Sequence, residues 1–192
     1  MELSGKRGYY ITGASGVGKT TIFTRIVGEV KALGCTVGGI CAPEVRERGV
    51  RVGFKIVDID GGEWGWLARV GGSGNLRIGK YVVVEEDAVR VGVRALEKAL
   101  KTRDIVAVDE IGPMELMVPR LRDSIISALE SGKLLLAVVH RDLKRRDPEV
   151  YRLVAGSGVT VEVTFDNRGF LLSRAGEVAL KIARSAGCGQ RG

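Results

Sequence analysis

The sequence predicts an α/β fold, with a mostly parallel sheet flanked by helices and an appended region of antiparallel β-hairpins. Strand-like and helix-like segments alternate along most of the 192 residues, which is typical of βαβ units that build a parallel sheet. Between residues 43 and 84 this alternation stops, and short β-like segments are separated by glycine clusters. Such a texture favours antiparallel hairpins. We therefore expect a single domain over residues 1–192, with a hairpin insertion at about 43–84.

The elements of the core are read from hydrophobic periodicity and from the residues that end helices. A helix is expected over residues 19–33, because Ile22, Ile26 and Val30 recur on one face and Gly34 is a typical helix stop. Other helices are expected over residues 85–101, 121–129 and 167–183. Core strands are expected over residues 7–12, 36–42, 104–108, 134–139 and 159–163. The β-like segments of the insertion are residues 50–59, 64–70 and 81–84, and residues 187–192 are expected to form a disordered tail.

The composition describes a folded and strongly basic chain. Apolar residues make up 45% of it, and the formal net charge is +7. No apolar run approaches the ~20 residues of a membrane helix, and residues 1–7 are polar and lack the apolar core of a signal peptide. The scarcity of Asn and Gln beside abundant Val, Arg and Glu is typical of thermophilic proteins. We expect a cytoplasmic protein without a membrane partner, either a monomer or a weak oligomer.

Neither the cysteines nor the basic residues indicate a dedicated site. Cys35, Cys41 and Cys188 are too few and too scattered for a disulfide framework, and no Cys or His spacing indicates a metal site. We interpret Cys35 and Cys41 as small strand residues. The basic residues are dispersed, with denser groups at residues 46–51 and 144–146, which favours a charged surface. Nucleic acid is a possible partner but not a required one.

A glycine-rich segment between the first strand and the first helix has the pattern GxxxxGK[ST] of a phosphate-binding loop. Its glycines let several backbone N–H groups point at phosphates, and the following helix adds its positive end. Lys19 is expected to reach the β- and γ-phosphates, and Thr20 to offer a hydroxyl to Mg²⁺. The expected nucleotide-binding residues here are Gly13, Ala14, Ser15, Gly16, Val17, Gly18, Lys19, Thr20 and Thr21. An idle Gly-rich turn is the alternative, but the strand before the loop and the helix after it favour phosphate binding.

Two adjacent carboxylates follow the apolar run of residues 105–108. A second acid that orients Mg²⁺ is best placed at the end of a buried strand beside the one that leads into the loop. Asp109 is expected to hold Mg²⁺ together with Thr20, and Glu110 to polarise an attacking water. The alternative is that both acids only end a strand and begin a turn.

Three segments resemble the family of cancer-related nucleoside-triphosphatases and their thermophilic phosphohydrolase relatives. They are residues 11–20, residues 39–54 and residues 108–116, where the run Asp-Glu-Ile-Gly-x-Met-Glu is the most specific. Asn167 and Arg168 also look like the family, and the similarity spans about residues 9–182. The resemblance implies a RecA-like P-loop NTPase fold and slow, Mg²⁺-dependent hydrolysis of ATP, GTP and other nucleoside triphosphates.

The resemblance also implies site residues beyond the two motifs. Residues 105–112, with Ile111 and Gly112, would form the second wall of the nucleotide site, and Glu44 and Arg46 would lie near the phosphates. Pro113 stands where many members have lysine, so any nucleotide contact of that lysine would be lost here.

Several other residues carry two interpretations each. Arg46 either stabilises charge on the transferred phosphoryl group or forms a surface salt bridge with Glu44 or Glu47. Arg168 either lies at the base or is a surface residue at a helix start. His140, the only histidine, either senses the γ-phosphate or is a structural residue at a strand end.

Two further features are equally open. Trp64 and Trp66 alternate on one strand and share a face, so they either stack on bases or pack in the interior or an interface. Glu115 either orders a water near the site or only begins a helix.

Three functions compete at this stage. The first is hydrolysis of nucleoside triphosphates, which Glu110 beside Asp109 favours. The second is a nucleotide or nucleoside kinase, for which residues 144–146 would have to act as a basic lid. The third is an RNA-associated nucleotide switch, which the net charge of +7 motivates.

Overall fold

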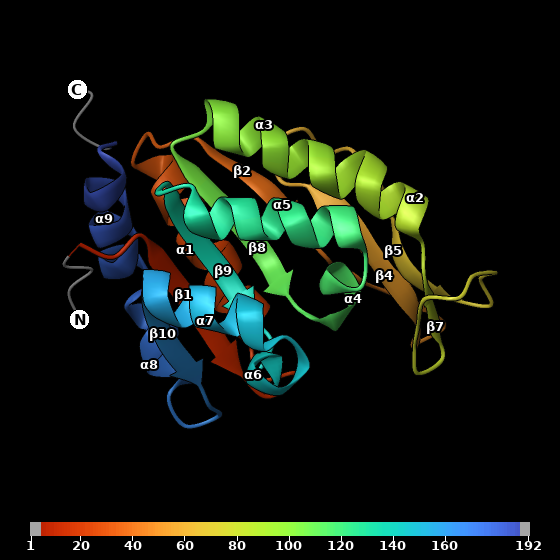
Figure 1. The fold of residues 1–192 in the computed structure, drawn as a ribbon. Coiled ribbons are helices and arrows are strands. Elements are labelled where there is room, and N and C mark those ends of the chain that lie inside the picture. Colours follow the sequence, from red (N-terminus) through yellow and green to blue (C-terminus); the bar gives the residue numbers. More distant parts are fainter. Residues whose placement is uncertain (1–4, 189–192) are drawn as a thin grey trace.

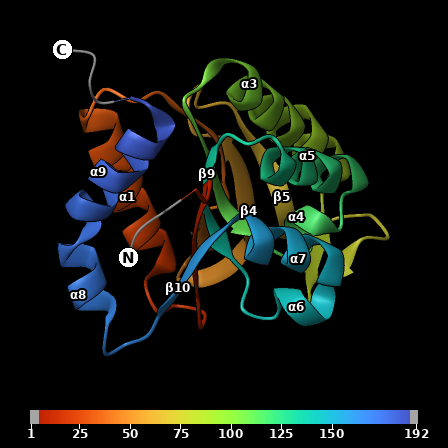
Figure 2. The same ribbon diagram turned by 60° about the vertical axis from the view of Figure 1, so that its left-hand side comes forward.

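A single mixed sheet forms the middle layer of the molecule, with helices on both of its faces (Figures 1 and 2). The computed structural model describes residues 5–188; residues 1–4 and 189–192, and with them parts of the expected polar N-terminus and tail, lie outside it. Within this part the sheet has ten strands in the order β10-β1-β9-β8-β2-β4-β5-β7-β6, and β3 pairs with β4. The strands are β1 (Gly8–Gly13), β2 (Val37–Cys41), β3 (Glu44–Glu47), β4 (Val50–Asp58), β5 (Trp64–Val70), β6 (Arg77–Ile78), β7 (Tyr81–Val83), β8 (Ile105–Ile111), β9 (Leu134–Val139) and β10 (Gly158–Val163).

The parallel half of the sheet contains the strands expected from the apolar runs. β1 pairs in parallel with β10 and β9, β9 with β8, and β8 with β2. The expectation that the strand ending in Asp109 lies beside the loop-bearing strand is wrong, because β9 lies between β1 and β8. The order of strands along the chain does not fix their lateral order, since a crossover helix can carry the chain past a place that a later strand fills.

The antiparallel half confirms the expected hairpin region. β4 pairs antiparallel with β2, β3 and β5, and β7 pairs antiparallel with β5 and β6. We call β3–β7 the hairpin wing; it extends the sheet on the right of Figure 1. The short strands β3 and β6 were not expected, because Glu-Val-Arg-Glu and Arg-Ile carry too few apolar residues for a strand pattern.

The helices form two layers that bury two separate cores. On one face, α1 (Lys19–Ala32), α8 (Arg168–Ser173) and α9 (Ala175–Ala186) cover the strands around β1. The other face carries α2 (Glu85–Asp87), η1 (Ala88–Val93), α3 (Arg94–Thr102), α4 (Pro113–Leu116), α5 (Pro119–Glu130), α6 (Leu143–Arg146) and α7 (Pro148–Ser157). No helix within residues 5–188 is long and apolar enough to cross a membrane.

The helix predictions hold for α1, α5 and the continuous run α2–η1–α3, and they fail in two places. Helices α6 and α7 were not expected, because residues 140–158 are rich in charge and show weak periodicity. The expected helix over residues 167–183 is broken at Arg174 into α8 and α9. Figure 2 shows α8 and α9 stacked end to end beside α1.

The prediction that Cys35 is only a small strand residue is wrong. Cys35 lies in the turn between α1 and β2 and forms a disulfide with Cys188, 153 residues away. Both sulfur-bearing residues are buried in the core beneath α1 and α9. The expected tail therefore does not include Gly187 and Cys188, which are fixed at the end of α9. Cys41 is a free cysteine of β2, as expected.

Candidate active site

The loop between β1 and α1 is shaped by glycines in conformations that other residues rarely adopt. Gly13, Gly16 and Gly18 have φ values of 143°, 74° and 105°. A Cβ at Gly13 would lie 2.3 Å from the carbonyl oxygen of Val163 in β10, so the loop starts where two strands touch. The first turn of α1 begins at Lys19, and its free N–H groups face the loop. The sequence-predicted phosphate cradle is therefore present as strand, loop and helix.

Lys19 lies across this loop. Its ammonium group donates hydrogen bonds to the carbonyl oxygens of Gly13 at 3.1 Å and Ala14 at 3.0 Å. The same positive charge lowers the pKa of the carboxyl groups of Asp109 and Glu110, against the larger effect of their burial. One cation therefore links the phosphate loop to the two acids at the end of β8.

Asp109 and Thr20 meet at the carboxyl edge of the sheet. Burial raises the pKa of Asp109, while a hydrogen bond with Thr20 lowers it. The backbone fixes the position of this acid, because the N–H of Ala42 donates to the carbonyl oxygen of Asp109 at 2.7 Å. The peptide bond between Asp109 and Glu110 is cis. The hydroxyl and carboxylate oxygens that the sequence assigned to Mg²⁺ are thus adjacent.

The donor set at this edge suits a hard cation that keeps most of its water. Within residues 5–188 no group of three or more His, Cys, Asp or Glu side chains is arranged to hold a metal. Mg²⁺ in phosphate-binding sites typically takes only one or two protein oxygens and completes its shell with phosphates and water. Thr20 and Asp109 fit that pattern.

Glu110 and Glu115 form a second acidic pair beside Asp109. The pKa of Glu110 is raised by burial and further by the charge of Asp109. Glu115, on α4, is 4% exposed, and burial followed by the charge of Glu110 raises its pKa well above the usual range. Glu115 lies within α4, which begins at Pro113, and it interacts electrostatically with Glu110 and Asp109; a role in ordering a water stays a prediction. Pro113, which precedes it, occupies the first turn of α4.

His140 lies at the end of β9, beside Ile111 of β8. Its backbone N–H donates to the carbonyl oxygen of Ile111 at 3.1 Å, which joins the ends of β9 and β8. Its ring Nδ1 accepts from the N–H of Asp142 at 3.2 Å. Burial lowers the pKa of the imidazole, and the charges of Arg146 and Lys19 lower it further. His140 is therefore a neutral ring that caps a turn and also lies within the field of the phosphate loop.

Two predicted site residues contact partners outside the loop. Arg46 donates to Glu44 at 2.6 Å and to the carbonyl oxygen of Gly49 at 2.9 Å, so the structure shows the surface salt bridge. Arg168, at the start of α8, lies over the ring of Phe165 at 5.2 Å. Roles for Arg46 at the phosphates and Arg168 at the base remain predictions.

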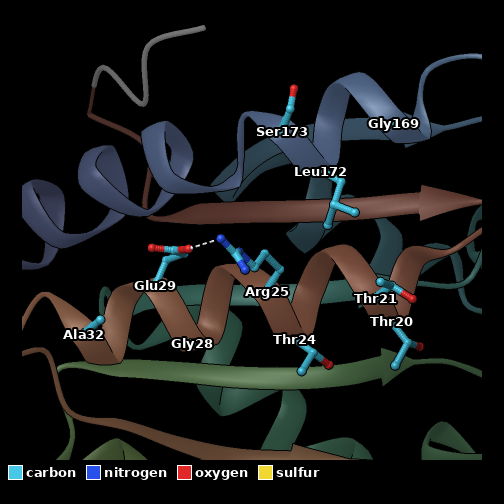
Figure 3. A pocket seen from close by; sticks show the side chains of 10 residues that line it. All are labelled: Thr20, Thr21, Thr24, Arg25, Gly28, Glu29, Ala32, Gly169, Leu172 and Ser173. Carbon is cyan, nitrogen blue, oxygen red and sulfur yellow. Dashed lines mark ion pairs between the residues drawn. The ribbon is translucent and has the colours of Figure 1, made fainter.

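A groove runs from the phosphate loop between α1 and α8 (Figure 3). Thr20 and Thr21 lie at one end of it, beside the carboxyl ends of the strands. Along the groove Arg25 and Glu29 are joined by an ion pair of 2.7 Å. The lining residues are Thr20, Thr21, Thr24, Arg25, Gly28, Glu29, Ala32, Gly169, Leu172 and Ser173.

Comparisons with known proteins identify the family of this chain. The family model described as NTPase matches residues 8–175. The chain is 42% identical over 182 residues to the nucleoside-triphosphatase THEP1 of Hyperthermus butylicus, covering 94% of this chain and 95% of that protein. It is 39% identical over 160 residues to the nucleoside-triphosphatase THEP1 of Sulfurisphaera tokodaii, covering 83% and 86%.

Two solved structures share the fold. The solution structure of a human cancer-related nucleoside triphosphatase superposes with a TM-score of 0.75 at 27% identity, covering 93% of this chain and 98% of that one. The crystal structure of THEP1 from the hyperthermophile Aquifex aeolicus gives a TM-score of 0.72 at 27% identity, covering 90% and 98%. From the phosphate loop, the acids of β8 and these matches over most of its length, the chain belongs to the NTPase family of P-loop nucleoside-triphosphatases.

Proposed function

We propose that this chain hydrolyses nucleoside triphosphates to nucleoside diphosphates and phosphate, with Mg²⁺ and with a water that Glu110 activates. One observation carries the proposal: the charge of Lys19 acts on both Asp109 and Glu110, while Thr20 hydrogen-bonds Asp109. The proposed phosphate-binding lysine thus lies close enough to the proposed metal ligand and the proposed base for its charge to act on both. Phosphoryl transfer depends mainly on such positioning and charge stabilisation.

The roles follow from the chemistry of each group. The loop amides and Lys19 bind the β- and γ-phosphates, for which Lys19 exchanges its two carbonyl partners for phosphate oxygens. Thr20 and Asp109 would hold Mg²⁺, which when bound neutralises charge on the phosphate oxygens. Burial raises the pKa of Asp109, because a carboxylate loses its hydration there. A bound cation would offset this cost and keep Asp109 ionised.

Glu110 is the group best placed to take a proton from water. A raised pKa brings a carboxylate closer to the pH at which it works and makes it a stronger base. Glu115 acts through Glu110 as a positioning residue. Burial raises the pKa of Glu115 well above its usual range, and its carboxyl oxygen lies beside that of Glu110 over Gly112, so Glu115 can hold Glu110 in place.

The groove of Figure 3 supports broad base specificity. A nucleoside attached to phosphates at Thr20 and Thr21 extends toward α8, near Arg168 and Phe165. The lining holds no Asn or Gln to read adenine by paired hydrogen bonds, and its one arginine, Arg25, is held by the ion pair with Glu29. The nearby Asn167 is used within its own loop, because its amide accepts from the N–H of Thr164 at 2.8 Å and donates to the carbonyl oxygen of Glu162 at 2.9 Å.

Phosphate release tests the proposal directly. We expect the wild-type chain to release phosphate from ATP, GTP, CTP and UTP only with Mg²⁺, and Lys19→Ala to abolish release. Glu110→Gln should keep nucleotide affinity and lower kcat about 10²–10⁴-fold. Glu130→Gln, at an exposed site on α5, is the matched control and should leave kcat unchanged.

Two outcomes would contradict the proposal. If Lys19→Ala released phosphate as fast as wild type, the loop would not be the site. If γ-labelled phosphate appeared on an added nucleoside or nucleoside monophosphate instead of free phosphate, the chain would be a kinase. Unchanged kcat in Glu110→Gln would remove Glu110 from the role of base while leaving the site in place.

A further inference from the structure

One face of the hairpin wing gathers the chain's two tryptophans and three cations. Residues that pair directly across strands lie on the same face. Lys55 pairs with Trp66, and Val57 with Trp64. Val82 of β7 pairs with Arg69 of β5 on one side and with Arg77 of β6 on the other. We call this surface the tryptophan face; it comprises Lys55, Val57, Trp64, Trp66, Arg69 and Arg77.

The opposite face of the same strands is covered. Ile56 pairs with Gly65, and a Cβ at Gly65 would lie 2.6 Å from the carboxyl carbon of Asp87 in α2. Ile56 and Leu67 belong to the core under α3 and η1. In contrast, no described residue of β4–β7 contributes to the core that α1 and α9 bury. The core on that side therefore ends at β2, and the tryptophan face is open around Trp64. Val82, between Arg69 and Arg77, is only 1% exposed, because the segment of Gly72 and Gly74 lies against it.

The tryptophan face is exposed and carries positive charge. Trp64 is 49% exposed, Arg69 and Arg77 are exposed, and Trp66 and Lys55 are half-buried. Among the described residues, none of the three cations forms an ion pair within 4.0 Å, although the charge of Arg69 acts on Asp87 of α2. The acids of the wing point elsewhere: Glu44 binds Arg46 and Arg51, and Glu63 binds Arg90. No acid occupies this face of the described strands β4, β5 and β6.

One of the three cations is in contact with a tryptophan ring. The ammonium group of Lys55 lies 3.7 Å from the centroid of the Trp64 ring. The ring of Trp66 lies close to the neighbouring strand, since a Cβ at Gly53 would lie 2.9 Å from its Cζ3 atom. Glycine at position 53 thus makes room for this ring on the strand beside it. The sheet surface therefore presents indole planes between positive charges.

From this arrangement we propose that the tryptophan face binds single-stranded nucleic acid. Unpaired bases stack on aromatic rings, and positive charges beside the rings hold the phosphates of the backbone. Trp64 and Trp66 supply the stacking planes, while Lys55, Arg69 and Arg77 supply the cations. A base that stacks on Trp64 replaces the ammonium of Lys55, which then becomes available to a phosphate. The net charge of +7 favours approach of a polyanion.

The tryptophan face also lies close to the triphosphate site in the sheet. Cys41 of β2 pairs with Val57 on one side and with Asp109 of β8 on the other. One strand, β2, therefore lies between Val57, the edge residue of this face, and Asp109, the proposed metal ligand. A nucleic acid strand bound there would lie on the same sheet as the phosphate site. The proposal itself does not depend on hydrolysis, because binding is measured without any nucleoside triphosphate.

Intrinsic fluorescence is a direct readout, since both tryptophans of the chain lie on this face. We expect a 15-nucleotide oligouridylate or oligodeoxythymidylate to quench the emission in a saturable way at ~50 mM salt. A fluorescein-labelled oligonucleotide should give the same affinity by anisotropy. With three cations engaged, the slope of log affinity against log salt should be about −2. Lys19→Ala should bind equally well.

Paired variants separate stacking from charge. Trp64→Ala and Trp66→Ala should each weaken binding about 5- to 100-fold, and Trp64→Phe should restore most of the loss. Arg69→Glu and Arg77→Glu should weaken binding and flatten the salt slope. Arg184→Glu, an exposed site on α9, changes the net charge by the same amount and should weaken binding much less.

Several results would overturn the proposal. One is no quenching and no anisotropy change at low salt. Another is equal loss in Arg184→Glu and Arg69→Glu, which would indicate only diffuse charge. Stronger binding of blunt duplex DNA or of polyglutamate than of the single strand would also contradict stacking. So would a wild-type dimer that binds no oligonucleotide and that Trp64→Ala converts to a monomer, because the face would then be a dimer interface.

Discussion

The carboxylates of Glu110 and Glu115 converge over the backbone of Gly112. A Cβ at this glycine would lie 2.7 Å from Oε1 of Glu110 and 3.2 Å from Oε2 of Glu115. The backbone there is extended, with φ −142° and ψ −179°, so its conformation does not require glycine. The absence of a side chain is what lets the proposed base and its buried partner approach each other.

Gly112→Ala should therefore damage activity more than stability. The added methyl group must displace Glu110, whose carboxylate is the nearest atom group, and kcat should fall about 10- to 100-fold because a base displaced by about 1 Å acts poorly. Unfolding in urea should change by only about 1–2 kcal/mol. Gly156→Ala in α7, where a Cβ meets no atom within 4 Å, is the matched control and should leave kcat unchanged. Full activity of Gly112→Ala would show that Glu110 need not lie where the structure places it.

Glu115 should make stability depend on pH in a defined direction. Its folded-state pKa is raised, so the folded state holds the proton more tightly than the unfolded chain, whose pKa is near 4.5. The free energy of unfolding should then decrease as the pH rises from 4.5 through the folded pKa. Between the pKa of the unfolded state and that of the folded state, the decrease is about 1.4 kcal/mol per pH unit. Glu115→Gln cannot ionise and should escape this loss.

Urea unfolding of wild type and Glu115→Gln from about pH 4 to about pH 8 measures the effect. The difference in stability between the two proteins should grow in favour of Glu115→Gln as the pH increases, since the other acids titrate in both. Glu130→Gln should track wild type at every pH. Parallel curves for wild type and Glu115→Gln would mean that Glu115 ionises normally.

Asp109→Asn should separate metal binding from folding. The amide keeps an oxygen for the Thr20 hydrogen bond but loses the charge that attracts Mg²⁺. We expect the Mg²⁺ concentration for half-maximal turnover to rise at least about 10-fold. Stability at neutral pH should not fall, because burial already disfavours the charged carboxylate. Asp123→Asn, at an exposed position on α5, is the control. If Asp109→Asn kept the Mg²⁺ dependence of wild type, Asp109 would not be a ligand.

Local signals explain which parts of the site the sequence predicts. The phosphate loop is found because its glycines, its lysine and the elements on both sides are contiguous. Asp109 and Glu110 are found because four apolar residues lead directly into them. The same reasoning identifies the hairpin region, since glycine clusters and short apolar runs are local features.

Contacts between distant segments explain what the sequence does not predict. The place of β9 between β1 and β8 depends on how the crossovers pack, and no residue pattern records it. His140 reaches the site because β9 ends beside Ile111. Arg46 looked like a catalytic cation, yet its position on the exposed strand β3 gives it a nearer partner in Glu44.

The disulfide between Cys35 and Cys188 is the longest of these contacts in sequence. It ties the end of α9 to the turn after α1, and the two residues are 4% and 2% exposed. A cross-link that closes so long a loop restricts the unfolded chain strongly. Buried sulfur atoms also protect the bond from reductant until the chain opens. The bond should therefore contribute to stability without taking part in the site chemistry.

Cys188→Ser should lower the free energy of unfolding by about 2–4 kcal/mol. Without the cross-link between two residues 153 positions apart, the unfolded chain gains conformational entropy. For a chain of this size that corresponds to a melting temperature lower by about 5–15 °C. Thermal unfolding with and without a phosphine reductant measures it: wild type should lose the same amount when reduced, whereas Cys188→Ser should not respond. Cys41→Ser, which changes the free cysteine, should remain sensitive to reductant. A wild-type melting temperature that the reductant leaves unchanged, equal to that of Cys188→Ser, would show that the bond adds nothing to stability.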